Sequence, residues 1–235
     1  MPDPKNCAVL FSGGLDSTTA LYWARRRYDE VYALTFDYGQ RHRVEIRSAR
    51  WVARRLGIPH AVLRIDLRQV GGSALTDPAI AVPRHARVPR LRRAGPPATY
   101  VPFRNGILLA VAAAWAEARG ITELVCGFNI IDSPEYPDTR PAFVRAMERA
   151  VNAGTKSAVG APAMKIRAPF LALKKSDIIG IGLSLGADYS RSITCYSGLE
   201  TPCEACSACL LRARAFKEIG LADPLIERLA RGERK

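Results

Sequence analysis

A short glycine-rich string near the start of the chain constrains the fold more than any other feature. Residues 12–17 read Ser-Gly-Gly-Leu-Asp-Ser, directly after the apolar run Ala8–Phe11 and directly before a segment with helical periodicity. A strand, a tight turn and a helix in this order leave unpaired backbone N–H groups at the carboxyl end of a buried strand, where a phosphate chain can bind. We therefore predict a polyanion-binding turn at 12–17.

The residue types in this turn fit that prediction. Gly13 and Gly14 allow the backbone to approach phosphates closely, and Ser17 can cap the following helix or bond a phosphate oxygen. A carboxylate at Asp16, beside phosphates, is explained if it holds a divalent metal or orients a backbone N–H. An ordinary tight turn between a strand and a helix is the alternative interpretation.

Strand and helix patterns alternate along the chain. Apolar runs near 7–11, 31–36, 61–65 and 123–128 have the length of buried parallel strands. Between them lie helical patterns, such as the apolar face formed by Ile107, Leu108, Val111, Ala112 and Trp115, with Gly120 at the expected C-terminal cap. The predicted fold is α/β, with a doubly wound, mostly parallel sheet. In such a sheet, three loops would converge at the carboxyl ends of the strands, namely Ser12–Ser17, Asp37–Gln40 and Gly127–Asp132.

Four of the six cysteines gather near the end of the chain, at Cys195, Cys203, Cys206 and Cys209. Four thiolates complete a tetrahedral shell and favour structural Zn²⁺, which would fix the tail against the rest of the protein, whereas an iron–sulfur cluster is the alternative with the same ligand number. Cys7 and Cys126 lie inside strand patterns, where a free cysteine behaves as a small buried hydrophobe. A catalytic thiol at either position is the other interpretation.

Charge and composition restrict the class of protein. The 235 residues contain 48% hydrophobic side chains and carry a net charge of +13, without an apolar run of membrane-spanning length or a signal-peptide pattern at the start. We expect one globular, cytoplasmic unit and no membrane partner. Nucleic-acid contact would explain the positive charge, but only seven of the 35 basic residues are lysine, and the arginines are scattered. The densest cluster lies in a predicted loop that could contact RNA or a phosphate-rich ligand: Arg84, Arg87, Arg90, Arg92 and Arg93.

The 12–17 string resembles the pyrophosphate loop of the PP-loop ATP pyrophosphatases. It lacks the lysine of the GxxxxGK(S/T) phosphate loop. Further segments extend the resemblance, in order, to the 7-cyano-7-deazaguanine synthases within that class. These segments are Phe11–Thr19, Phe36–His42, Gly71–Thr76, Tyr100–Asn105, Tyr136–Asp138, Arg140–Pro141, Cys195–Tyr196, the cysteine quartet and Leu211–Arg212. Together they cover nearly the whole chain.

The resemblance implies a PP-loop domain, of the adenine nucleotide alpha hydrolase-like kind, over 1–190 and a zinc-binding helical tail over 191–235 packed on it. It implies an ATP-dependent carbon–nitrogen ligase that converts 7-carboxy-7-deazaguanine and ammonia into 7-cyano-7-deazaguanine through an adenylated carboxylate and an amide. The expected cofactors are one structural Zn²⁺ per chain and Mg²⁺, with ATP as co-substrate. A homodimer is expected, and nucleic acid is not expected as a partner.

The resemblance also implies roles for individual residues. The expected catalytic residues are Ser12, Asp16, Ser17, Arg104 and Lys175, with Arg104 and Lys175 each at the start of a helix. The expected nucleotide-binding residues are Phe11, Ser12, Gly13, Gly14, Leu15, Asp16, Ser17, Thr18, Thr19, Ala20, Leu21, Asp37, Tyr38 and Gln40. The expected substrate-binding residues are Arg104, Asn105, Gly127, Asn129, Asp132, Tyr136 and Asp138. Surface positions for Arg104 and Lys175, and a packing role for Tyr136, are the alternatives.

Three residues depart from the pattern of the family. Glu135 takes the place of a glycine, Ala142 that of a glutamate, and Glu204 that of the glycine usual after the second cysteine. The first two put the acceptor specificity in question, and the third would strain the zinc turn. Two other enzymes therefore stay open: a paralogue that transfers the activated acid to a different amine, such as a protein terminus, and a PP-loop enzyme that modifies tRNA. A nucleotide-binding module without catalytic activity is the third alternative.

Overall fold

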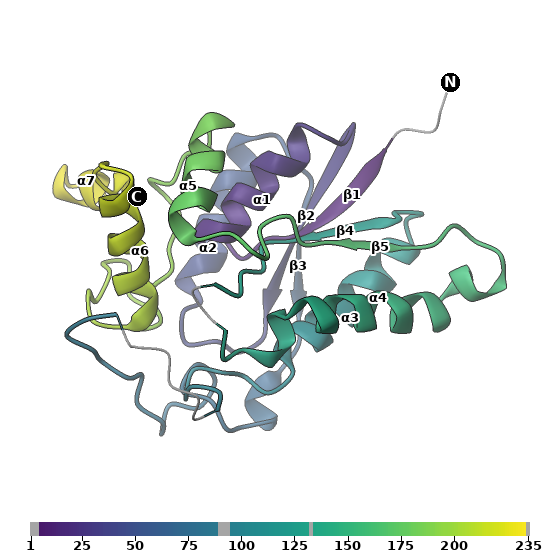
Figure 1. The fold of residues 1–235 in the computed structure, drawn as a ribbon, viewed down its shortest axis with the longest axis horizontal. Coiled ribbons are helices and arrows are strands. Elements are labelled where there is room, and N and C mark those ends of the chain that lie inside the picture. The colour runs from purple at the N-terminus through teal and green to yellow at the C-terminus, as the bar shows by residue number, and fades with distance from the viewer. Residues whose placement is uncertain (1–4, 89–94, 132–133, 234–235) are drawn as a thin grey trace.

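The computed structural model describes residues 5–88, 95–131 and 134–233. Its centre is a parallel sheet of five strands in the order β3-β2-β1-β4-β5 (Figure 1). The strands are β1 (Asn6–Leu10), β2 (Glu30–Asp37), β3 (His60–Arg64), β4 (Glu123–Cys126) and β5 (Lys165–Arg167). The four predicted strands are confirmed. Strand β5 was not predicted, because its three residues, Lys-Ile-Arg, contain one apolar side chain between two cations.

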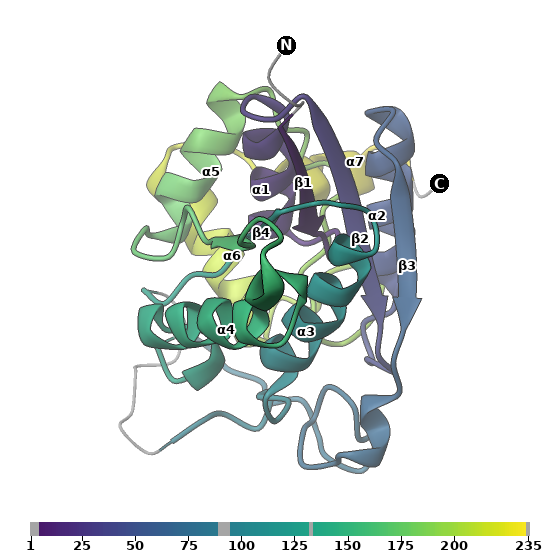
Figure 2. The same cartoon turned by 90° about the vertical axis from the view of Figure 1, so that its right-hand side faces the viewer.

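Helices cover both faces of the sheet, as the doubly wound prediction requires (Figures 1 and 2). One face carries α1 (Leu15–Arg25), α2 (Val44–Arg55) and α5 (Lys175–Ser184), and the other carries α3 (Arg104–Glu117) and α4 (Pro141–Ala153). The tail forms α6 (Ser207–Glu218) and α7 (Pro224–Ala230). Short 3₁₀ turns span Leu67–Gln69, Pro137–Thr139 and Lys156–Val159.

The core has two halves, one on each side of the sheet. Successive strand residues point to opposite faces, so Ala8 and Leu124 pack under α3 and α4, whereas Val9 and Val125 pack under α1, α2 and α5. All four side chains are fully buried. Because both faces are covered, these strands are continuous apolar runs rather than alternating ones.

The predicted apolar face of α3 is the face that packs on the sheet. Leu108 and Ala112 are buried there, and Ile107, Val111 and Trp115 pack against the same core. Gly120 follows the end of the helix with a φ of +66°, a conformation that glycine adopts without strain.

The tail is tied to the α/β part by buried polar contacts. The Arg212 side chain is 3% exposed, and its guanidinium donates to the Tyr189 carbonyl at 3.3 Å while it pairs with Asp223 of the tail at 2.6 Å. The Ile193 N–H donates to the Gly13 carbonyl at 3.1 Å, so the tail also touches the glycine-rich turn. Side chains of Tyr189 and Phe216 pack edge to face between α5 and α6.

The basic segment 84–93 is partly described. Residues 84–88 form no helix or strand, in agreement with the predicted loop, and Arg90, Arg92 and Arg93 lie outside the described residues. The His85 N–H donates to the Ala205 carbonyl at 2.8 Å, which places this loop against the cysteine-rich turn. Over the described part of the chain, no helix is long and apolar enough to span a bilayer.

Candidate active site

The glycine-rich turn connects β1 to α1 and packs directly on α2. Gly13 has a φ of +88°, and a Cβ at this position would lie 2.5 Å from the Glu45 carbonyl oxygen and 2.7 Å from the Ala49 nitrogen. Only glycine fits such a close approach. Gly14 is the N-cap of α1, which begins at Leu15, and no side chain caps the helix. The first N–H groups of α1 are therefore not occupied by a capping side chain.

The hydroxyls of the turn are held by local hydrogen bonds. Ser12 Oγ accepts from the Gly14 N–H and lies 3.1 Å from Ser17 Oγ, and the Ser17 hydroxyl donates to the Gly14 carbonyl at 3.0 Å. The expected capping role of Ser17 is wrong, because Ser17 is the third residue of the helix and its hydroxyl bonds a carbonyl rather than an N–H. Thr18 donates to the same carbonyl at 2.8 Å, and Thr19 Oγ1 pairs with the Tyr189 hydroxyl at 2.6 Å.

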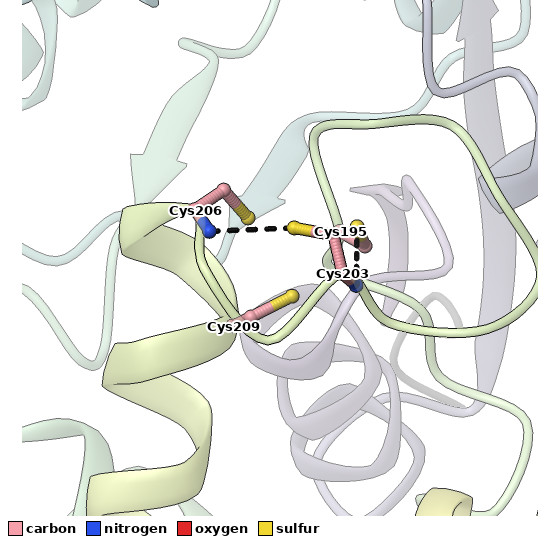
Figure 3. Close-up of side chains that lie close together, drawn as sticks. All are labelled: Cys195, Cys203, Cys206 and Cys209. Atoms are coloured by element: carbon pink, nitrogen blue, oxygen red, sulfur yellow. Dashed lines mark hydrogen bonds between the residues drawn. The ribbon is translucent and has the colours of Figure 1, made fainter. Parts of the chain in front are cut away.

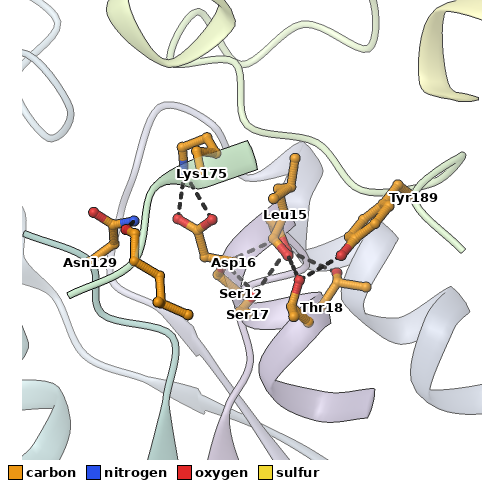
Figure 4. Close-up of polar contacts among 11 residues, drawn as sticks. Ser12, Leu15, Asp16, Ser17, Thr18, Asn129, Lys175 and Tyr189 are labelled. Carbon is orange, nitrogen blue, oxygen red and sulfur yellow. Dashed lines mark hydrogen bonds and ion pairs between the residues drawn. The ribbon is translucent and has the colours of Figure 1, made fainter. Parts of the chain in front are cut away.

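Asp16 and Lys175 form an ion pair above the turn (Figure 4). Lys175 is the first residue of α5, as predicted, and its Nζ lies 2.6 and 2.8 Å from the two carboxylate oxygens of Asp16. The side chains are 14% and 25% exposed. Opposite charges thus meet where the turn opens into a cavity.

That cavity has a volume of about 290 Å³ and lies at the carboxyl ends of the strands. The predicted residues among its lining are Phe11, Ser12, Gly14, Leu15, Asp16, Ser17, Tyr38, Gln40, Arg104, Asn105, Gly127, Asn129, Tyr136 and Lys175. The predicted residues outside the lining are Gly13, Thr18, Thr19, Ala20, Leu21, Asp37 and Asp138. Asp37 instead pairs with Arg43 at 2.5 Å, and Asp132 lies outside the described residues.

Arg104 enters the cavity from the first turn of α3. The preceding residue, Phe103, has a φ of +51°, in the left-handed region, and its N–H donates to the Tyr100 hydroxyl at 2.9 Å. The guanidinium donates to the Tyr38 hydroxyl at 3.1 Å. Burial alone would lower the pKa of Arg104, but Tyr38 and Asp138 raise this pKa more, so the guanidinium stays charged.

Polar groups of the predicted substrate set are positioned by backbone contacts. Asp138 accepts from the Asn105 N–H at 2.9 Å and is 3% exposed, so it holds the start of α3 from beneath. Asn129 donates to the Leu173 carbonyl at 2.6 Å. The Tyr136 hydroxyl pairs with Thr99 Oγ1 at 2.6 Å, and its ring packs edge to face on Tyr100.

Outside the tail, three polar side chains of the lining had no predicted role: His42, Glu45 and Thr139. His42 is the last residue of the resembling segment Phe36–His42, and Glu45 lies three residues further on, so this segment was the available signal for both. Burial raises the pKa of Glu45 to about 8 and lowers that of His42 to about 3. The tail adds lining residues that were not predicted as site residues, including Thr194, Tyr196 and Arg212.

The four tail cysteines point toward one another (Figure 3). Their sulfur atoms all lie within 4.8 Å of one another. Tetrahedral Zn–S bonds of about 2.3 Å place thiolates about 3.8 Å apart, so the cluster has the dimensions of a four-thiolate metal site. The Cys203 N–H and the Cys206 N–H point at the sulfurs of Cys195 and Cys203, each at 3.3 Å. Such N–H contacts stabilise thiolates, and the cluster can hold a metal ion.

The other two cysteines are fully buried in β1 and β4. Burial raises the pKa of Cys7 and of Cys126 to about 12, so both stay protonated near neutral pH. Cys126 lines the cavity, and its thiol contacts the Arg167 carbonyl at 3.4 Å. The predicted burial of both cysteines is confirmed, and the raised pKa argues against a nucleophilic thiol.

Comparison with known proteins identifies the family. The family described as queuosine biosynthesis protein QueC matches residues 6–220. A 7-cyano-7-deazaguanine synthase of Anaeromyxobacter sp. is 48% identical over 94% of this chain and 96% of the relative, and one of Azotobacter vinelandii is 46% identical over 94% and 97%. The chain belongs to the 7-cyano-7-deazaguanine synthase family. The resemblance that the sequence motifs predicted is confirmed.

The positions that depart from the family pattern can now be placed. Neither Glu135 nor Ala142 lines the described cavity of this synthase-family chain, and Ala142 is an exposed residue of the first turn of α4. Glu204 has a φ of +56°, the left-handed conformation that favours glycine. The expected strain in the cysteine turn therefore has a structural basis.

Proposed function

We propose that this chain converts 7-carboxy-7-deazaguanine and ammonia into 7-cyano-7-deazaguanine with ATP, through an adenylated carboxylate and an amide. One structural observation supports this proposal in addition to the membership of the family. The glycine-rich turn, Arg104 and the Asp16–Lys175 pair line the same cavity. A nucleotide held at the turn and an acid held at Arg104 would therefore share one site.

The chemistry requires such a shared site. A carboxylate is a poor electrophile because it is anionic and its leaving group would be oxide, so its oxygen must be joined to AMP before ammonia attacks. The backbone N–H groups at the start of α1 would bind the departing pyrophosphate. Bound Mg²⁺ would neutralise charge on the phosphates, and the Asp16 carboxylate at the turn can ligate it.

Arg104 and Lys175 would each bind a different anionic group. The charged guanidinium of Arg104 can pair with the substrate carboxylate through two parallel hydrogen bonds. Lys175, which is paired with Asp16, can contact a phosphate oxygen from the other side of the turn. Asn129 and Asn105 would offer amide groups to the deazaguanine, and Tyr136 would offer a ring for stacking. The same residues would serve again when the amide oxygen is activated for its dehydration to the nitrile.

The four cysteines would hold Zn²⁺ as a structural ion. Four thiolates leave no coordination position for water, so the ion would not take part in the reaction. Its proposed role is to order the tail, which brings Thr194 and Tyr196 to the cavity. We also propose that 1–190 and 191–235 act as one globular unit, since Arg212 donates to the Tyr189 carbonyl and the Ile193 N–H donates to the Gly13 carbonyl across that boundary.

We further propose a homodimer and a cytoplasmic location. Exposed apolar side chains such as Phe103 and Val159, which are 53% and 85% exposed, are compatible with contacts between copies. Sedimentation velocity on the purified chain tests the dimer, and a single monomeric species at micromolar concentration would contradict it.

Incubation with ATP, Mg²⁺, 7-carboxy-7-deazaguanine and ammonium tests the activity. We expect AMP, pyrophosphate and first the amide, then the nitrile, by mass spectrometry. Asp16→Asn should abolish pyrophosphate release and leave the thermal unfolding temperature of the protein unchanged. If AMP and pyrophosphate form without amide or nitrile, a different amine acceptor is favoured, and if neither forms, the proposed activity is wrong.

A further inference from the structure

Glu45 is a buried carboxyl group of the cavity wall that the proposed chemistry has not used. It lies in the first turn of α2 and is 9% exposed. Among the described residues, no hydrogen bond or ion pair reaches its carboxyl group. A buried acidic group without such partners is costly, so its retention in a cavity indicates a contact with a bound molecule.

The other charged side chains of the cavity wall are already engaged. Asp16 is paired with Lys175, Arg212 with Asp223, and Arg104 donates to the Tyr38 hydroxyl. Glu45 therefore differs from every other charged group that lines the described cavity. An amine or ammonium ion entering this space would find its free carboxyl oxygens there.

Glu45 lies near the two groups that would hold the reacting molecules, the glycine-rich turn and Arg104. The backbone of its residue touches the glycine-rich turn at Gly13. Its carboxyl group is also close enough to Arg104 for the guanidinium charge to act on it. If Arg104 holds the substrate carboxylate, as proposed above, the activated carbonyl carbon forms in the same cavity that Glu45 lines.

We infer that Glu45 accepts the proton that the ammonia nucleophile must lose during amide formation. The inference rests on the proposed function. In this step an N–C bond forms, the bond between the carbonyl carbon and the AMP oxygen breaks, and AMP leaves with the electron pair. Acyl adenylate and ammonium become amide, AMP and two protons, of which Glu45 takes the first and solvent the second.

The environment of Glu45 suits this role. Burial raises its pKa to about 8, although the nearby Arg104 lowers it in part. A general base is most effective when its pKa lies near the working pH, and an ordinary glutamate is too weak a base for ammonium.

The test separates adenylation from amine attack with two nucleophiles. Glu45→Gln is compared with the natural protein at one near-neutral pH. Carboxylate-dependent exchange of labelled pyrophosphate into ATP, without amine, measures adenylation. Amide formation with ammonium and hydroxamate formation with hydroxylamine measure attack. At this pH ammonia is almost wholly protonated, whereas hydroxylamine is mostly neutral and needs no base to become a nucleophile.

We expect Glu45→Gln to keep pyrophosphate exchange and hydroxamate formation within a few-fold and to lose about 10²-fold in amide formation. Glu45→Asp should recover part of this loss. Glu218→Gln, an exposed carboxyl in α6, is the matched control and should leave all three rates unchanged.

Three results would overturn the inference. Unchanged amide formation shows that Glu45 is not needed, and an equal loss with both nucleophiles shows that it does not act on the amine proton. Loss of exchange together with both products shows a structural role. Absence of exchange in the natural protein is a different result, because it contradicts the proposed function itself.

Discussion

At the scale of single residues, two residues with strained backbone conformations stand out. Phe103 and Glu204 both adopt left-handed backbone conformations. Each lies next to a functional group, Arg104 in one case and the flanking cysteines in the other. Non-glycine residues are held in this conformation only where surrounding contacts fix them, which is typical of functional sites.

Glu204→Gly should stabilise the metal-loaded protein. A residue with a Cβ in the left-handed conformation costs about 1–2 kcal/mol of stability, and glycine removes this cost. Part of the stability gained is lost again because glycine makes the unfolded chain more flexible. We expect a net increase of about 1 kcal/mol in the free energy of unfolding, measured by chemical denaturation. Ala213→Gly, at an exposed position inside α6, should have the opposite sign. A lower stability of Glu204→Gly would show that its carboxylate contributes more than the backbone costs.

Lys175→Ala should reduce adenylation more than it reduces stability. The change leaves the Asp16 carboxylate without its cation and removes a positive charge from the proposed pyrophosphate site. Loss of one such group costs about 10²-fold in turnover. Carboxylate-dependent pyrophosphate exchange measures the effect, and Lys174→Ala, an exposed neighbour, is the control. Equal rates for the two variants would contradict a role for Lys175 in the reaction.

At the scale of helices and strands, the contact of α5 with α1 holds the turn in place. Gly182 of α5 lies against the Tyr189 hydroxyl, which pairs with Thr19 of α1 at 2.6 Å. A side chain at position 182 would collide with that hydroxyl. Because α1 begins at the glycine-rich turn and α5 begins at Lys175, their packing sets the distance between Asp16 and its partner.

Gly182→Ala should therefore destabilise the protein, by about 1–3 kcal/mol, because it overpacks this contact. A Cβ at Gly180, two residues earlier, would meet no atom within 4 Å. Gly180→Ala should instead stabilise the helix by about 0.5–1 kcal/mol. Thermal unfolding of both variants measures the difference. Equal effects would show that the helices can separate without cost.

At the scale of the whole molecule, the tail completes the site. Thr194, Tyr196 and Arg212 line the cavity although they lie beyond residue 190. The tail also contacts the turn through Ile193 and Gly13. The four-cysteine cluster and the proposed nucleotide site are thus parts of one structure, and loss of the proposed ion should affect both.

Removal of the metal should expose four thiols and weaken nucleotide binding. After chelation we expect four cysteines to react with a thiol reagent, and all six only after unfolding. Cys7 and Cys126 should stay unreactive in the folded protein, because burial raises the pKa of each to about 12. Titration calorimetry should show weaker ATP binding to the chelated protein. An unchanged thiol count after chelation would contradict a metal bound by these cysteines.

The sequence by itself determined the features that depend on local order along the chain. Apolar runs of strand length, the glycine-rich turn after β1 and the spacing of four cysteines are local patterns, and each predicted its structure. The start of α3 at Arg104 and of α5 at Lys175 also agreed with expectation. Only the tertiary structure decided which polar side chains share the cavity. Asp37 and Asp138 bond elsewhere, whereas Glu45, Thr194 and Tyr196 enter it, because lining a cavity depends on contacts between elements that are far apart in sequence.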